Sequence, residues 1–274
     1  FGAGHPMMFA LAVSLGCDVF DSAAYALYAR DDRYMTPTGT KQLDSLEHFP
    51  CACQICSETT PPELRDNPPA DRYESLAWHN LHVSFAEINR IKQAIRDGQL
   101  LELVEQRARS HPALLDGYRE ALTFVDTLEQ ADPVRKGTFF YVSSESASRP
   151  EVTRYQRRLD RLSPPDELVL TRYPHEVKNK HTNSTTWEVI VPFGPVPPSL
   201  KETHPVSGEF PENTDLIGIK RAINGINRLQ SVHTDGSITV IASEWPDQLQ
   251  DQFSEDIQKN TELDVSTPVS QEHE

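Results

Sequence analysis

Three of the four cysteines of the chain fall within six positions, as Cys51-x-Cys53-x-x-Cys56, and this cluster constrains the fold more than any other feature. A disulfide interpretation fits poorly, because three clustered thiols leave one unpaired and no secretory signal is recognisable. Thiolates this close together are typical ligands of a tetrahedral metal, most often Zn²⁺. A fourth ligand is then needed from further along the chain, and either His79 or His82 can supply it.

Two further residues bear on this metal site. His48 is nearer to the cluster, but its short tether to Cys51 makes ligation less favourable. Three cysteines and one histidine complete a tetrahedron and leave no open position for water, so we expect one structural Zn²⁺ rather than a catalytic one. The fourth cysteine, Cys17, lies in an apolar segment and is expected in the core.

The charge of the chain is strongly negative and unevenly distributed. Its 274 residues contain 41 acidic and 26 basic side chains, a net charge of −15, and much of the excess lies in residues 230–274. On charge alone this argues against an obvious nucleic-acid-binding protein. It is typical of proteins from a salt-rich cytoplasm, with an ordinary acidic surface as the alternative. No apolar run approaches the roughly 20 residues that span a bilayer, so we expect no membrane association and a cytoplasmic location.

Hydrophobic periodicity, turn residues and capping motifs predict the elements of secondary structure. A short buried helix over 6–15 ends at Gly16, and a capping box at Ser84 and Glu87 begins a helix that Gly98 stops, after a loop over 57–72. The other expected helices cover 100–109, 111–129 and 215–230, a further one begins at Ser148 and Pro150, and the expected strands cover 17–21, 139–142, 168–170, 187–191 and 237–243.

Two carboxylates flank the apolar segment from Cys17 to Asp21. If the segment is a strand of a parallel sheet, Asp21 lies at its carboxyl end, where α/β folds place their chemistry, and Asp18 lies at its start. From position alone, Asp21 is a candidate catalytic residue, with an aspartate that caps the loop as the alternative. For Asp18 we expect a structural rather than a catalytic role.

The residues identified so far resemble a known family. The sequences FGAGHPMMFALAVSLGCDVFDSAAYALYARDDRYMT, CACQIC and LAWHNLHVSFAEINRIKQAIRDGQLLELVEQRARSHPAL are similar to archaeal tRNA-guanine transglycosylases. The similarity is dense over residues 1–130 and becomes weak after about residue 212. The resemblance is specific because three features occur in the family's order. They are an apolar strand with a carboxylate, a Cys-x-Cys-x-x-Cys loop and a downstream histidine.

The resemblance implies an α/β fold, namely the C-terminal end of a TIM (β/α)8 barrel with a zinc-binding insertion, followed by a small α+β domain. Cys17–Asp21 is then the last barrel strand, and the chain, which begins with Phe rather than Met, is expected to be a fragment that lacks the N-terminal barrel half and is inactive alone. The implied domains are the barrel end with its zinc subdomain over 1–132, the small domain over 133–212, a helix–strand unit over 213–245 and a disordered acidic tail over 246–274.

The resemblance also implies the chemistry. Members of the family exchange the guanine at position 15, in the D-loop of archaeal tRNA, for 7-cyano-7-deazaguanine in the biosynthesis of archaeosine. Asp21 matches the nucleophile that attacks the ribose anomeric carbon. Substrate binding is assigned to Gly2, Ala3 and Gly4, and the zinc ligands to Cys51, Cys53, Cys56 and His79, where the HNL context selects His79 over His82.

The expected partners are tRNA, guanine, 7-cyano-7-deazaguanine and a second copy in a homodimer. For the tRNA contact we select a basic helix face formed by Arg154, Arg157, Arg158 and Arg161, with a merely solvated helix as the alternative. Two other functions remain open. One is the archaeosine synthase paralogue, and the other is a zinc-stapled subunit that binds tRNA or a protein partner without activity of its own.

Overall fold

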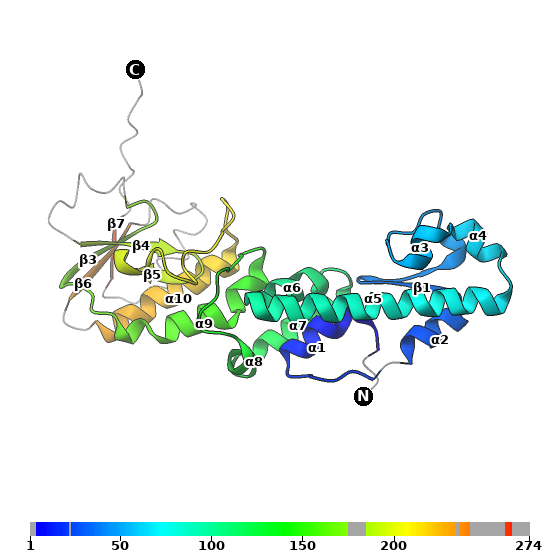
Figure 1. Cartoon of the computed structure of the whole chain (residues 1–274). Coiled ribbons are helices and arrows are strands. Elements are labelled where there is room, and N and C mark those ends of the chain that lie inside the picture. The colour runs from blue at the N-terminus through cyan, green and yellow to red at the C-terminus, as the bar shows by residue number, and fades with distance from the viewer. Residues whose placement is uncertain (1–3, 22, 175–184, 234–235, 242–260, 265–274) are drawn as a thin grey trace, which may run out of the picture. The chain divides into compact units, whose positions relative to one another are not determined.

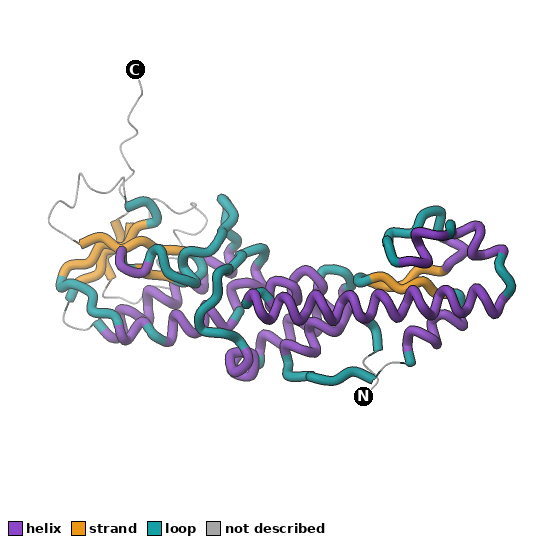
Figure 2. The backbone as a smooth tube through the Cα atoms, viewed as in Figure 1, coloured by secondary structure: helices purple, strands orange, loops and turns teal. Residues whose placement is uncertain are grey.

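The computed structural model describes residues 4–21, 23–174, 185–233, 236–241 and 261–264. The chain is a mixed α/β protein that divides into two compact units, residues 1–137 and 138–274. The first unit is mostly helical and the second contains the main sheet (Figure 2).

A single long helix, α5 (Pro69–Asp97), organises the first unit (Figure 1). Pro69 fits its first turn, and Gly98 adopts the left-handed conformation that ends it, with φ of 70°. The expectation that this helix begins at Ser84 is wrong. Ser84 lies inside α5 and donates to the carbonyl of Asn80, while Glu87 forms ion pairs instead of a cap.

The expected loop over 57–72 also contains helix. A capping box does form there, because Thr60 and Glu63 exchange hydrogen bonds at the start of α4 (Pro61–Asp66), after the short α3 (Gln54–Glu58). The same motif therefore occurs one helix earlier in the chain than the sequence analysis placed it.

The C-terminal half of α5 packs in a helical group. Its other members are η1 (Pro6–Met8), α1 (Phe9–Ser14), α6 (Leu100–Ala108), α7 (Pro112–Thr123) and α8 (Val125–Ala131). Their core joins Phe9, Ile91, Val104, Tyr118 and Leu128. The expected helix over 6–15 is confirmed, with Gly16 at φ of 94° beyond its end. The expected helix over 111–129 is broken at Phe124.

The N-terminal half of α5 carries a different cluster of elements. α2 (Ala24–Arg30), the antiparallel strands β1 (Arg33–Thr36) and β2 (Gly39–Gln42), η2 (Leu43–Ser45), α3 and α4 surround it. The buried residues Tyr34, Leu43, Leu64 and Leu76 form a second core in this region.

The segment Cys17–Asp21 is not a strand. Val19 is 83% exposed, and Cys17 is half-buried, with its thiol directed to the carbonyl of Val19. A buried parallel strand requires neighbouring strands for its backbone hydrogen bonds, and the described residues of the first unit contain only the β1–β2 pair. The expectations of a strand here and of a core position for Cys17 are therefore wrong for this chain.

The second unit is built on a five-stranded sheet of order β5-β4-β3-β6-β7. Its strands are β3 (Glu167–Thr171), β4 (Thr185–Ile190), β5 (Gly194–Val196), β6 (Ser237–Ile241) and β7 (Thr261–Asp264). β3 pairs in parallel with both β4 and β6, and only β5 is antiparallel to its neighbour. The expected strands over 168–170, 187–191 and 237–243 are thus present, whereas 139–142 makes only an isolated bridge from Phe140 to Glu209.

Helix α10 (Leu216–Val232) buries an apolar face against this sheet. Ile219, Ile223 and Ile226 pack with Leu168, Leu170 and other inward side chains of β3, β4 and β6. The unit also contains η3 (Ser144–Ser148), α9 (Pro150–Arg157), η4 (Leu159–Arg161) and η6 (Pro198–Leu200), of which η3 and η4 contact α10. A second core of this unit includes Phe139 and Phe193.

Because β6 pairs with β3, residues 213–245 do not form a unit apart from 133–212. Within the expected disordered tail, residues 261–264 form β7, which pairs in parallel with β6, and the rest of 246–274 lies outside the described residues. Among the helices of the described residues, none combines the length and the apolarity needed to cross a bilayer.

Candidate metal centre

The sulfur atoms of Cys51, Cys53 and Cys56 and one ring nitrogen of His79 converge, with all four atoms within 4.8 Å of one another. His79 Nδ1 lies 3.4 Å from the Sγ atoms of both Cys53 and Cys56. Around a tetrahedral Zn²⁺, a sulfur and a nitrogen ligand are separated by about 3.5 Å. The donor set and its spacing fit one closed metal site, as the sequence analysis predicts.

The ligands come from the loop that leads into α3, from α3 itself and from α5. Cys53 is the N-cap of α3 and Cys56 lies within it, whereas His79 projects from the interior of α5. The backbone N–H of Cys53 also points at Cys51 Sγ, 3.4 Å away, an arrangement that favours the thiolate form. A bound metal therefore ties the loop over 51–56 to the long helix.

The orientation of His79 is set by a hydrogen bond on the far side of its ring. Nε2 lies 2.9 Å from the carbonyl oxygen of Met35 in β1, and it can only donate there. That donation places the proton on Nε2 and leaves Nδ1 as a lone-pair donor aimed at the cysteines. The buried hairpin strand thus selects the tautomer that a metal requires.

Tyr34 covers the site from the hairpin. Its ring stacks on the imidazole of His79 with centroids 3.8 Å apart, and the ring of Phe49 stacks on Tyr34 with centroids 5.2 Å apart. The hydroxyl of Tyr34 is 3.3 Å from Cys56 Sγ. These aromatic rings exclude water from one side of the ligand set.

Asn80 anchors the hairpin to α5. Its Oδ1 accepts a hydrogen bond from the N–H of Met35 at 2.8 Å, and its Nδ2 donates to the carbonyls of Tyr25 and Arg33. The side chain is fully buried. It therefore fixes the strand whose carbonyl orients His79.

Burial governs the protonation of the ligands. It lowers the pKa of His79 to about 4, so the imidazole is neutral at pH 7, which is the form that binds metal. Burial also raises the pKa of Cys56 to about 12 and raises that of Cys51. The thiols of Cys51 and Cys56 are consequently protonated without a metal, and a bound divalent ion has to displace those two protons.

The sequence analysis missed Tyr34, Met35 and Asn80. The run of β-favouring residues on either side of the Pro37-Thr38-Gly39 turn could have indicated the hairpin. Nothing local could have indicated that Met35 lies opposite His79, because that contact joins residues 44 positions apart.

The structure does not gather the other predicted site residues around the metal. Asp21 lies exposed in the segment between α1 and α2, as does Asp18. Gly4 is half-buried just before η1, and Gly2 and Ala3 lie outside the described residues.

The predicted basic helix face is only partly exposed. Arg157, Arg158 and Arg161 are exposed, but Arg154 is 6% exposed, because the short helix α9 buries most of its residues within the second unit. The assignment of Arg154 to an exposed contact is therefore wrong, and the other three arginines stay a prediction.

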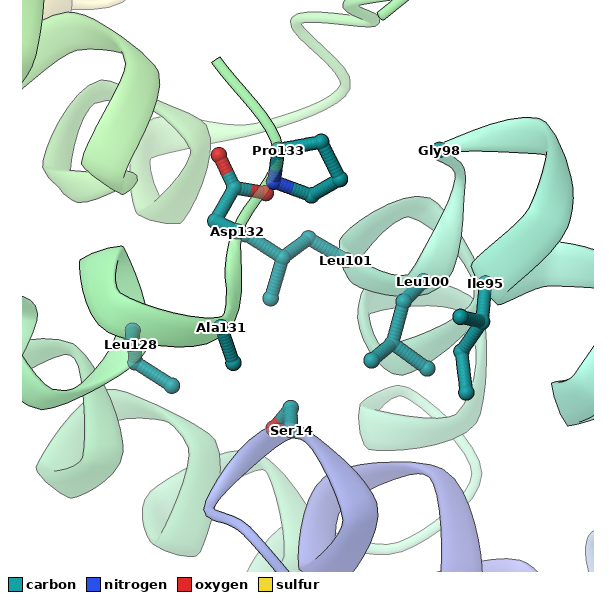
Figure 3. Close-up of a pocket in the computed structure, with 9 residues that line it drawn as sticks. All are labelled: Ser14, Ile95, Gly98, Leu100, Leu101, Leu128, Ala131, Asp132 and Pro133. Carbon is teal, nitrogen blue, oxygen red and sulfur yellow. The ribbon is translucent and has the colours of Figure 1, made fainter.

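A small apolar pocket is present in the helical group of the first unit (Figure 3). Its lining consists of Ser14, Ile95, Gly98, Leu100, Leu101, Leu128, Ala131, Asp132 and Pro133. None of these residues is a metal ligand or a predicted site residue, so the pocket does not belong to the candidate site.

Known proteins resemble this chain over both units. Residues 1–113 match the family described as TGT, queuine tRNA-ribosyltransferase. The tRNA-guanine(15) transglycosylase of Haloferax volcanii is 54% identical over 90% of the chain and 48% of its own length. The enzyme of the same name from Haloarcula marismortui is 52% identical over 90% of the chain and 50% of its own length. That from Archaeoglobus fulgidus is 42% identical over 97% of the chain and 53% of its own length.

The chain thus spans about half the length of the curated relatives it matches. Its similarity to them extends beyond the metal-binding unit into the second unit, so it does not rest on the cysteine motif alone. By both comparisons the chain is similar to the tRNA-guanine transglycosylases.

Proposed function

We propose that this chain supplies the metal centre and the catalytic aspartate of an archaeal tRNA-guanine(15) transglycosylase. The reaction exchanges the guanine at position 15 in the D-loop of tRNA for 7-cyano-7-deazaguanine, toward archaeosine. The observation that carries the proposal is the Cys51, Cys53, Cys56 and His79 centre, found in a chain 54% identical to a relative of that name. The archaeosine synthase paralogue has no specific observation in its favour.

The activity is proposed for the chain together with the sequence that corresponds to the other half of its relatives. In that protein, residues 1–21 would belong to the C-terminal end of a TIM barrel, with the metal-binding region as an insertion and the second unit as the small domain that follows. The segment Cys17–Asp21 would then gain the parallel neighbours that a barrel strand needs.

Asp21 is the proposed nucleophile. Its carboxylate attacks the ribose anomeric carbon, the glycosidic bond breaks, and guanine leaves with its bonding electrons and takes up a proton. The incoming deazaguanine loses a proton and displaces the carboxylate, which restores Asp21. A second acid that shuttles the proton lies in the other half of the protein, and Gly2, Ala3 and Gly4 line the base pocket.

The metal has a structural role in this proposal. Four protein ligands leave no position for water or substrate, so Zn²⁺ would join the hairpin and the cysteine loop to α5 without taking part in the exchange. We further propose a homodimer, and a cytoplasmic location because the tRNA substrate lies there.

The test replaces the nucleophile in an active protein. The 274-residue chain is joined to the N-terminal half of the Haloferax volcanii relative, and exchange is measured as radiolabelled guanine incorporated into a tRNA transcript. Asp21→Asn should abolish both exchange and the covalent tRNA adduct while leaving tRNA affinity nearly unchanged. Asp18→Asn, an identical change three residues away in the same exposed segment, is the matched control and should keep activity.

A covalent adduct formed by the Asp21→Asn protein would refute the nucleophile assignment. The second candidate function, a metal-stapled tRNA- or partner-binding subunit, is favoured by the exposed, non-strand conformation of Cys17–Asp21. It predicts tRNA binding without exchange in the wild-type fusion.

A further inference from the structure

Two elements of the second unit lie side by side and meet through hydrogen bonds that involve basic residues. α9 runs beside α10 (Figure 1), and Gln156 Nε2 of α9 donates to the carbonyl of Arg221 in α10 at 2.6 Å. Two turns further along α10, Arg228 Nη2 donates to the carbonyl of Arg157 at 3.2 Å. The relative placement of the two elements is therefore fixed at both positions.

The outer face of α10 is basic in a strongly acidic chain. Residues 216–232 contain Lys220, Arg221 and Arg228 and no Asp or Glu, although the whole chain has a net charge of −15. The inward face of the helix is committed to the sheet through Ile219, Ile223 and Ile226. An exposed stripe runs along the opposite face through Lys220, Asn224, Arg228 and Ser231.

Arginines from both elements converge beside this stripe. Arg221 Nη2 donates to Thr153 Oγ1 of α9 at 2.8 Å. Burial, and then the neighbouring positive charge of Arg157, lowers the pKa of Arg221. The two positive charges disfavour each other, and a polyanion that binds across them favours both.

We propose that the basic ridge formed by Arg157, Lys220, Arg221 and Arg228 binds the sugar–phosphate backbone of tRNA. Lys220 and Arg228 are eight residues apart, about 12 Å along the helix axis, so they reach different phosphates. Guanidinium groups suit phosphate oxygens, and Asn224 supplies a neutral amide donor between the two cations. The inference rests on the proposed function for the identity of the RNA, and it replaces the buried Arg154 with residues of α10.

The experiment measures the affinity of the 274-residue chain for a fluorescent tRNA transcript by anisotropy, between about 0.05 and 0.5 M salt. The test variants are Lys220→Gln with Arg228→Gln, and the same pair changed to Glu. The control carries Lys92→Glu with Arg96→Glu, two exposed basic residues of α5, and so changes the net charge by the same amount as the Glu pair. Melting curves and zinc content accompany each variant.

Removing two phosphate contacts should weaken binding about ten-fold near 0.15 M salt and reduce the slope of log affinity against log salt by about 1.5. The Glu pair should lose more affinity, and the α5 control should stay within about two-fold of wild type. Unchanged affinity and slope in the Gln pair overturns the proposal even if the Glu pair misfolds. Absence of measurable tRNA binding by the wild-type chain also overturns it.

Two further arms separate this inference from its alternatives. If poly-glutamate displaces the chain from the tRNA as effectively as unlabelled RNA of equal charge, the ridge fits an acidic protein and the proposal fails. If the fusion protein shows no base exchange but the Gln pair still weakens tRNA binding, the proposed activity fails and the ridge stands. If the fusion protein exchanges the base but the Gln pair binds tRNA with unchanged affinity, the proposed tRNA contact of the ridge fails and the proposed activity stands.

Discussion

Replacing Asn80 with alanine tests whether the metal centre depends on a residue that touches no metal. Asn80 makes three hydrogen bonds to backbone groups, namely the N–H of Met35 and the carbonyls of Tyr25 and Arg33. The variant removes all three hydrogen bonds, so the three backbone groups lose their partner, and it leaves a cavity at a fully buried position. Met35 should then move, and its carbonyl should no longer hold His79.

The magnitude follows from the count of orphaned groups. A buried backbone group that loses its partner costs about 1–3 kcal/mol, and the two carbonyls retain a second lone pair for other donors, so we expect a total loss of about 3 kcal/mol from the first unit. Loss of an outer partner that orients a metal-binding histidine typically lowers metal affinity about 10–100-fold. Both effects should appear together.

Hydrogen–deuterium exchange followed by mass spectrometry measures the first effect on peptides that cover β1 and β2. Competition with a chromogenic chelator measures zinc affinity. Asn89→Ala provides the matched control, because Asn89 is an exposed asparagine on the same helix and loses the same atoms. The control should match wild type in both assays.

One result would contradict the reasoning directly. If the Asn80→Ala chain binds zinc as tightly as the Asn89→Ala chain and protects the hairpin equally, then the hydrogen bonds of Asn80 do not position His79. Weaker protection with unchanged zinc affinity would show that the hairpin is stabilised by Asn80 but that the histidine is held by α5 alone.

Two further changes test the metal and the core of the first unit. Cys53→Ser should lower bound zinc from one equivalent to a small fraction and lower the melting temperature, because serine is a poor zinc ligand, and full zinc content by elemental analysis would count against the site. Arg107→Met should destabilise the first unit by about 3 kcal/mol in urea, because Glu87 is fully buried and accepts two hydrogen bonds from Arg107, at 2.7 and 2.9 Å. Adding Glu87→Gln should recover more than half of that loss, and strictly additive losses would refute the coupling.

Local patterns in the sequence were sufficient for several elements. The apolar period of α10, the β-branched runs of β3, β4 and β6, and the glycine that ends α5 all produced the expected structure, because each depends on neighbours a few residues away. The capping-box motif misled at Ser84, where the packing of a 29-residue helix outweighs a local end signal.

Residue type and spacing alone determined the chemistry of the metal site. Cysteine sulfur and imidazole nitrogen select a metal such as zinc wherever the chain brings them together, and the cluster at 51–56 already forced three of them into one place. The choice of His79 over His82 came from resemblance to known relatives, and the fold explains it. His79 is buried at 1% exposure beside the cysteines, while His82 is exposed.

Only the tertiary structure decided what surrounds those ligands and which basic residues reach solvent. Met35 contacts His79 across 44 residues, and Arg157 contacts Arg228 across more than 70 residues, so no local pattern records either contact. In Cys17–Asp21 a local pattern is present but the predicted structure is not, because its apolar residues satisfy the pattern of a buried strand without forming one. A strand also needs partners to receive its hydrogen bonds, and partners are a property of the assembled fold rather than of the segment.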